Sequence, residues 1–124
     1  MKFLSRFEPM AYAAMRIVCG FLFSCHGAQK LFGAFGGHQV SIHTPLMLAA
    51  GIIEFGGGVL ILVGLFTHIA GFVASGEMAV GYFMMHAGKG FFPIQNGGEL
   101  AVVYCFLFLF IACRGAGKFG VDKS

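Results

Sequence analysis

Long runs of apolar positions alternate with short polar or glycine-rich stretches along this chain of 124 residues, and the pattern predicts four helices. The predicted helices cover residues 9–31, 45–66, 69–86 and 99–113. A membrane-spanning helix needs roughly 20 mostly apolar residues, and the four runs approach or reach this length. We therefore expect an all-α integral membrane four-helix bundle, a single domain over residues 1–124 with short connections.

Glycines and prolines mark the expected helix ends. Pro9 suits the first turn of the first helix, and the glycine-rich stretch after that helix suits its end. Thr44 and Pro45 have the order of an N-cap residue and a first helical residue. Only Thr67 and His68 separate the second and third helices, so these two should be antiparallel neighbours.

Composition agrees with a chain that lies in lipid. Hydrophobic residues make up 58% of the chain and charged residues 10%, and the mean hydropathy is +0.86. A soluble domain has about 45–50% apolar and about 25% charged residues. The net charge of +3 is small and scattered, which argues against nucleic acid as a partner. The expected partners are the lipid bilayer and other membrane-protein subunits.

The distribution of basic residues predicts an orientation, because cytoplasmic flanks of membrane helices carry an excess of lysine and arginine. Five basic residues lie near the two termini: Lys2, Arg6, Arg114, Lys118 and Lys123. Only Lys30 and Lys89 fall on the opposite side of the predicted bundle. Both termini are therefore expected in the cytoplasm, and the short loops and this charge bias suit a multi-pass protein of a bacterial inner membrane.

Three ionisable residues fall in the middle of predicted spans: Arg16, Glu54 and Glu77. A charge at mid-membrane costs about 2.5–3.5 kcal/mol on insertion scales, so such side chains normally face the bundle interior and pair. We expect an intramembrane polar network in which Arg16 pairs with Glu54 or Glu77. One arginine cannot neutralise two carboxylates, and one of the two glutamates is expected to be protonated at neutral pH.

A second group of polar residues lies nearer the outer rim of the predicted bundle: His26, Lys30 and Glu99. Lys30 and Glu99 come out at similar depth and form the second expected ion pair. A quinone head group needs a hydrogen-bond donor and a proton source at the bilayer rim. These three residues are the candidate quinone site.

Other interpretations of the same residues stay open. A buried arginine–glutamate pair can serve only to fix helix register. His26 and His86 are the only histidines within predicted spans and could ligate a b-type haem, although no spacing enforces it. The cysteines, Cys19 and Cys113 among them, form no C-x-x-C motif and predict no disulfide framework and no metal site. Free cysteine is commonly a small buried hydrophobe, and a redox role is the alternative.

Residues 16–32, RIVCGFLFSCHGAQKLF, resemble the first helix of DoxX family membrane proteins, in which an arginine, a glycine four residues on and then HG-x-x-K-L-F recur. Residues 49–67, AAGIIEFGGGVLILVGLFT, resemble the second helix of that family. Phe92-Pro93 and residues 96–99 match more loosely, and the tail of residues 117–122 keeps the family's glycine and late aspartate without the usual tryptophan or serine beside it. The positions that carry the resemblance are Arg16, Gly20, His26, Gly27, Lys30, Glu54 and Glu99.

The family takes its name from proteins similar to the small membrane subunit of an archaeal thiosulfate:quinone oxidoreductase, and other members are associated with thiol redox systems. The resemblance therefore implies a membrane subunit of a redox assembly with a quinone as candidate ligand. The sequence has no flavin fingerprint, no iron–sulfur cysteine motif and no covalent cofactor site, so an oxidoreductase role would require redox centres in a partner. Two alternatives are a non-catalytic scaffold subunit and a transporter of protons or small molecules.

Overall fold

The computed structural model describes residues 2–34 and 45–123, and in this part of the chain all regular elements are helices, with no strand. The all-α prediction is confirmed. The long helices are α2 (Glu8–Phe32), α3 (Pro45–Val63), α4 (Thr67–Met85) and α6 (Glu99–Arg114). Three short segments are α1 (Lys2–Ser5), η2 (Ala87–Lys89) and α5 (Pro93–Asn96). The expected N-cap, Thr44, lies outside the described residues.

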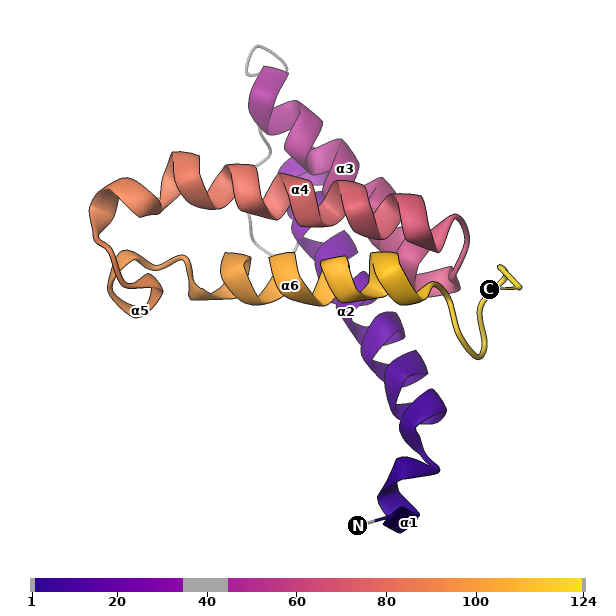
Figure 1. Ribbon diagram of the computed structural model, residues 1–124. Coiled ribbons are helices and arrows are strands. Elements are labelled where there is room, and N and C mark those ends of the chain that lie inside the picture. Colours follow the sequence, from indigo (N-terminus) through magenta and orange to yellow (C-terminus); the bar gives the residue numbers. More distant parts are fainter. Residues whose placement is uncertain (1, 35–44, 124) are drawn as a thin grey trace.

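The long helices form two antiparallel pairs that lie across each other (Figure 1). Helix α2 packs along α3, and α4 packs along α6. Helices α3 and α4 are joined by residues 64–66 and diverge from this connection (Figure 1). By length and composition, two helices of the described chain, α2 and α3, are long and apolar enough to cross a membrane.

Glycines allow α2 and α3 to approach until their backbones touch. A Cβ atom on Gly20 would lie 2.5 Å from the backbone nitrogen of Leu62. A Cβ atom on Gly58 would lie 2.5 Å from the backbone nitrogen of Ser24, and Gly27 faces the backbone of Phe55 as closely. Small residues at such contacts are typical of helices that pack in a membrane. Gly20 and Gly27 therefore lie on the packed side of α2.

The connection between α3 and α4 lies at residues 64–66, a few residues before the predicted position. Gly64 adopts a left-handed conformation, with φ of 74°. The backbone N–H of Leu65 donates to the carbonyl of Leu60, and that of Gly64 to the carbonyls of Leu60 and Ile61. This is a Schellman motif, which ends a helix at a glycine. Helix α3 therefore ends at Val63 rather than at residue 66.

The core lies where the two helix pairs cross. Phe23 of α2 packs against Phe108 of α6 with ring centroids 4.6 Å apart, and Tyr104 stacks on Phe108 at 5.3 Å. All three side chains are buried. Phe106 and Phe110, which alternate with Phe108, are exposed. The phenylalanine-rich run in α6 therefore divides into one core residue and two residues on the outer surface.

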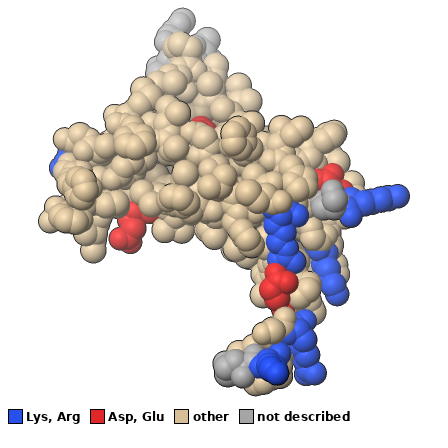
Figure 2. Space-filling model, viewed as in Figure 1, with Lys and Arg blue, Asp and Glu red and all other residues tan. Residues whose placement is uncertain are grey.

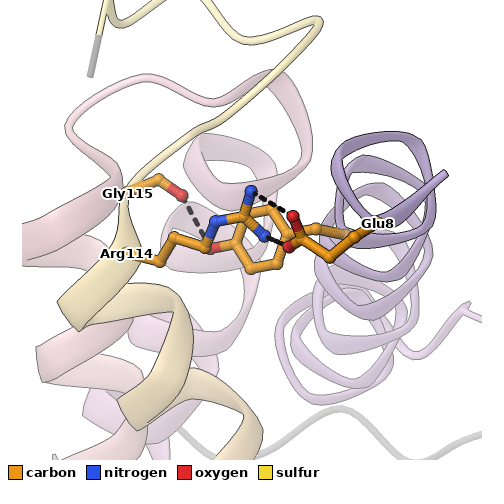
Figure 3. Close-up of polar contacts among 4 residues, drawn as sticks. Glu8, Arg114 and Gly115 are labelled. Carbon is orange, nitrogen blue, oxygen red and sulfur yellow. Dashed lines mark hydrogen bonds and ion pairs between the residues drawn. The ribbon is translucent and has the colours of Figure 1, made fainter. Parts of the chain in front are cut away.

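Most of the basic side chains visible in Figure 2 lie at the end of the molecule where α2 begins and α6 ends in Figure 1. At this end Arg114 forms an ion pair with Glu8 and connects the end of α6 to the start of α2 (Figure 3). The Arg114 guanidinium also lies 4.0 Å from the ring centroid of Tyr12. The Tyr12 hydroxyl donates to the carbonyl of Gly115, at 2.6 Å. The end of α6 is thus held against the first turns of α2.

The C-terminal tail folds back over the connection between α3 and α4. The backbone N–H of Val121 donates to Val63 and that of Asp122 to Gly64. In return, the Asp122 carboxylate accepts hydrogen bonds from the backbone N–H groups of Thr67, at 2.8 Å, and Phe66, at 3.0 Å. A carboxylate at a helix N-terminus satisfies free N–H groups and complements the helix dipole. Asp122 therefore caps α4 from a distant part of the sequence.

This cap makes stability depend on pH. The hydrogen bond from the Thr67 backbone, and then that from Phe66, lower the pKa of Asp122. A lowered folded-state pKa contributes stability above the ordinary aspartate pKa of about 3.9, and this contribution is lost as the pH falls through the folded-state value. Asp122→Asn is expected to lower the midpoint of thermal unfolding in detergent at neutral pH, with the difference from the unmodified chain closing in acid.

Lys123→Gln is the matched control, because Lys123 neighbours Asp122 and is exposed. It should leave the unfolding midpoint and its pH dependence unchanged. The cap does not stabilise the fold if Asp122→Asn and the unmodified chain have the same unfolding midpoint at neutral pH. The same conclusion follows if their midpoints differ as much in acid as at neutral pH.

Candidate functional site

Lys30 of α2 and Glu54 of α3 form an ion pair inside the molecule. The Lys30 Nζ atom lies 2.5 Å from Glu54 Oε1, and the exposed fractions of the two side chains are 26% and 2%. The close contact of Gly27 with Phe55 sets the register that brings the pair together, because Lys30 follows Gly27 by about one turn. The sequence-based pairing of Lys30 with Glu99 was wrong.

Glu77 of α4 is the third member of this site. Its carboxyl group lies beside that of Glu54 and within electrostatic reach of Lys30. The Glu77 Oε1 atom is buried and has no hydrogen-bond partner in the described part of the chain. Groups from three helices therefore meet, with one ammonium group facing two carboxyl groups. The expectation that one carboxyl group holds a proton stays a prediction, with Lys30 as the cation in place of Arg16.

Arg16 does not join the carboxylates. Its side chain is fully buried, and its guanidinium group donates to the carbonyls of Ile61, at 2.7 Å, and Leu62, at 2.8 Å. A third hydrogen bond, of 3.1 Å, reaches the carbonyl of Lys118 in the tail. The last carbonyls of a helix have no partner within it, and a cation at this end complements the helix dipole. The expected pairing of Arg16 with Glu54 or Glu77 was therefore wrong, and the visible role of Arg16 is to hold α3 and the tail against α2.

A cavity of about 390 Å³ opens beside the ion pair, between α3 and α4. Its walls are mainly apolar, and the ionisable residues among them are Lys30, Glu54, Glu77 and His86. Small-molecule sites are typically clefts of about 300–1,000 Å³ with mostly apolar walls and a few polar groups. The cavity has these properties, and three of its four ionisable wall residues, Lys30, Glu54 and Glu77, lie together.

A smaller cavity of about 200 Å³ shares the Lys30–Glu54 pair as a wall. His26, His86 and Tyr104 also line it. The His26 ring meets Tyr104 edge-on, with centroids 6.2 Å apart, and His86 Nδ1 lies 3.2 Å from the carbonyl of Asn96. The two histidines considered for haem therefore share a cavity. Its volume is below the about 300–1,000 Å³ usual for ligand sites, and haem binding by this pair stays an untested alternative.

The residues expected at the outer rim separate in the structure. Lys30 joins the ion pair and His26 lines the smaller cavity, whereas Glu99 is exposed in the first turn of α6. No side-chain hydrogen bond or ion pair connects Glu99 to another residue of ranges 2–34 and 45–123. Sequence reasoning missed Tyr104 as part of the site. Its position five residues after Glu99 in the last helix gave no sign that it would face α2.

The cysteines remain free thiols. Cys19 is buried in the core, and Cys113 is exposed near the end of α6. Neither lines the two cavities described above. Within the described residues, no group of three or more histidine, cysteine, aspartate or glutamate side chains is placed to hold a metal ion. A redox role for the thiols has no geometric support at this site.

Comparison with known proteins identifies the family. The family model for DoxX matches residues 11–87, which include most of α2 and all of α3 and α4. An uncharacterized protein of Haemophilus influenzae is 43% identical over 127 residues, which cover 98% of this chain and 95% of that protein. No solved structure matches the chain. Because the match covers more than half of the sequence and includes Lys30, Glu54 and Glu77, the chain belongs to the DoxX family of membrane proteins.

Proposed function

We propose that this chain is the membrane-embedded subunit of a redox assembly and that it binds a quinone-type ligand beside the Lys30–Glu54 pair. The observation that carries the proposal is the mainly apolar cavity of about 390 Å³ with an ion pair and Glu77 at one side. A quinone is an apolar ring with two carbonyl acceptors. The cavity offers apolar walls for the ring and Lys30 as a donor to one carbonyl.

The second group suited to such a ligand is Glu77. Glu77 lines the cavity, and its Oε1 atom is buried and has no hydrogen-bond partner among the described residues. Leaving a buried polar atom unpaired costs about 1–3 kcal/mol, so a ligand that supplies the missing hydrogen bond gains affinity. In its protonated form the carboxyl group could also donate to the second carbonyl. Electrons for a quinone reaction are proposed to come from a partner subunit.

The site requires a membrane around it, and we propose that all four long helices span one. The outer faces of α4 and α6 support this, since they expose large apolar side chains: Ile69, Phe72, Phe83, Phe106 and Phe110. At about 1.5 Å per residue, α4 is about 28 Å long and α6 about 24 Å, close to the roughly 30 Å of a bilayer core. Membrane helices tilt by up to about 40°, so two crossed pairs can both span.

The charge distribution supports an orientation with both termini in the cytoplasm. Basic side chains concentrate at the end of the molecule where α2 begins and α6 ends (Figure 2). Positive residues favour the cytoplasmic side of a membrane. We therefore propose a bacterial inner membrane as the location, with the cavity nearer the opposite face.

Glu77→Leu tests the proposed site. In protein reconstituted into lipid nanodiscs, it is expected to weaken binding of a water-soluble benzoquinone by about tenfold, because a buried hydrogen bond is lost. Glu77→Gln should bind nearly as well as the unmodified chain, since an amide can donate and accept in place of a protonated carboxyl group. Isothermal titration calorimetry measures both affinities.

Glu99→Leu is the matched control, because it removes a carboxyl group outside the cavity, and it should bind like the unmodified chain. The proposed function is wrong if the unmodified chain binds no quinone analogue and purifies without a redox-active subunit. Equal binding by Glu77→Leu and Glu99→Leu would remove Glu77 from the site.

A further inference from the structure

We propose that the ligand enters this site sideways from the bilayer, between α3 and α4, and that a long apolar chain attached to its head group stays in this opening. The inference rests on the proposed function and specifies the class of ligand: an amphipathic lipid with a small carbonyl-bearing head, such as a quinone with a prenyl chain. Three observations carry it: the exposure of the cavity walls, the glycines of α4, and the location of the polar groups.

The walls of the larger cavity reach the outer surface of the protein. Leu46 of α3 is 55% exposed, and Val80 and Met84 of α4 are 56% and 57% exposed. All three line the cavity and are apolar. In a membrane, an apolar opening of this kind faces acyl chains, because the α3 and α4 residues around it belong to predicted spans. A ligand dissolved in the bilayer can therefore reach the cavity without crossing water.

Two glycines of α4 keep the opening free of side chains. A Cβ atom added to Gly76 would have no other atom within 4 Å, and one added to Gly81 would meet only the Glu77 Oε2 atom, at 4.0 Å. Both glycines line the cavity, and they lie on either side of Glu77 in the sequence. Their missing side chains leave room for an apolar chain between the bilayer and the Glu77 carboxyl group.

The location of the polar groups indicates which end of the ligand goes in first. Lys30, Glu54 and the unpaired Glu77 Oε1 atom lie at the inner side of the cavity, whereas the exposed residues around the opening are apolar. An acyl chain inserted from a phospholipid would press hydrocarbon against these charged groups and leave Glu77 unsatisfied. A ligand with an inner polar head and an outer apolar chain satisfies both parts of the cavity.

Gly76→Leu and Gly56→Leu form a matched pair for the test. Both glycines are helical and exposed, and a Cβ atom on either would meet no other atom within 4 Å, so both variants should fold. Only Gly76 lines the cavity. The full-length protein is reconstituted into liposomes, and binding is measured for a benzoquinone with a ten-carbon chain and for the same benzoquinone without a chain. Affinities are referred to the concentration of each probe in the bilayer.

Gly76→Leu should weaken binding of the ten-carbon probe by about tenfold or more, because a filled opening removes the surface that buries the chain. Gly76→Leu should weaken binding of the chain-less probe by a smaller factor than binding of the ten-carbon probe, and Gly81→Leu should show the same order. Gly56→Leu should match the unmodified chain with both probes. Equal loss in Gly76→Leu and Gly56→Leu, or no loss in Gly76→Leu, would overturn lateral access while leaving chain-less binding, and thus the proposed function, intact. If neither probe binds the unmodified chain, the proposed function fails, and lateral access fails with it.

Discussion

Replacing Arg16 by methionine is expected to lower the free energy of unfolding by about 3–5 kcal/mol, a large fraction of the stability of a small protein. The guanidinium group is fully buried and donates to three carbonyls, two at the end of α3 and one at Lys118. Methionine fills most of the volume but donates nothing, so all three carbonyls lose their charged donor. Unfolding by sodium dodecyl sulfate in mixed micelles, followed by circular dichroism, measures the change.

Arg6 supplies the control, because it is an exposed arginine in the turn directly after α1. Arg6→Met should change the free energy of unfolding by no more than about 0.5 kcal/mol. The losses in free energy of unfolding caused by Arg16→Met and by Glu54→Leu should be additive within about 0.5 kcal/mol in the double variant, because the two side chains share no partner. A strong coupling between Arg16 and Glu54, or equal effects of Arg16→Met and Arg6→Met, would contradict the capping role.

Lys30→Met is expected to have the next largest effect, a loss of about 3 kcal/mol, because it leaves the buried Glu54 carboxylate without its cation. Glu54→Leu alone should cost less, since the Lys30 side chain is partly exposed and can turn outward. The double variant, Lys30→Met with Glu54→Leu, should regain most of the lost stability. Replacement of a buried ion pair by apolar residues of similar size is often neutral.

A double-mutant cycle in the same unfolding assay measures this coupling, which we expect to be about 2–3 kcal/mol. Lys89→Met is the control for removing a lysine from the same end of the molecule, because Lys89 is exposed. Should Lys30→Met cost no more than Lys89→Met, or should the double variant be as unstable as the sum of the single ones, the ion pair does not stabilise the fold.

The helices could be predicted because their signals are local. Each long apolar run became a helix, and Pro9 and Gly33 lie at the two ends of α2 as their backbone preferences require. The end of α3 was placed too late because the apolar run continues through Leu65 and Phe66 beyond Gly64. There a glycine in a left-handed conformation outweighs hydropathy.

The ion pairs could not be predicted from depth alone. Counting residues from span ends treats the helices as parallel rods, whereas the pairs lie across each other (Figure 1). A better signal was present: Gly20 and Gly27 in α2 and Gly51 and Gly58 in α3 are each seven residues apart. Antiparallel alignment of these two pairs places Gly20 against Gly58, as observed, whereas Gly27 meets Phe55, about one turn after Gly51.

The contacts of the C-terminal tail were beyond the sequence for a different reason. Asp122 caps a helix 55 residues earlier in the chain, and Arg16 binds a carbonyl 102 residues later. Such contacts depend on how helix ends come together in space, and no local pattern encodes them. The glycine and aspartate of the tail were noted only through the resemblance to the DoxX family.

The most direct test of the account is quinone binding by the Lys30→Met, Glu54→Leu double variant in lipid nanodiscs. Because the variant should keep its fold, a loss of binding cannot be attributed to unfolding, and circular dichroism on the same sample checks this. We expect a folded protein whose affinity for the chain-less benzoquinone is at least about tenfold weaker than that of the unmodified chain. A folded double variant that binds this probe as tightly as the unmodified chain would contradict this expectation.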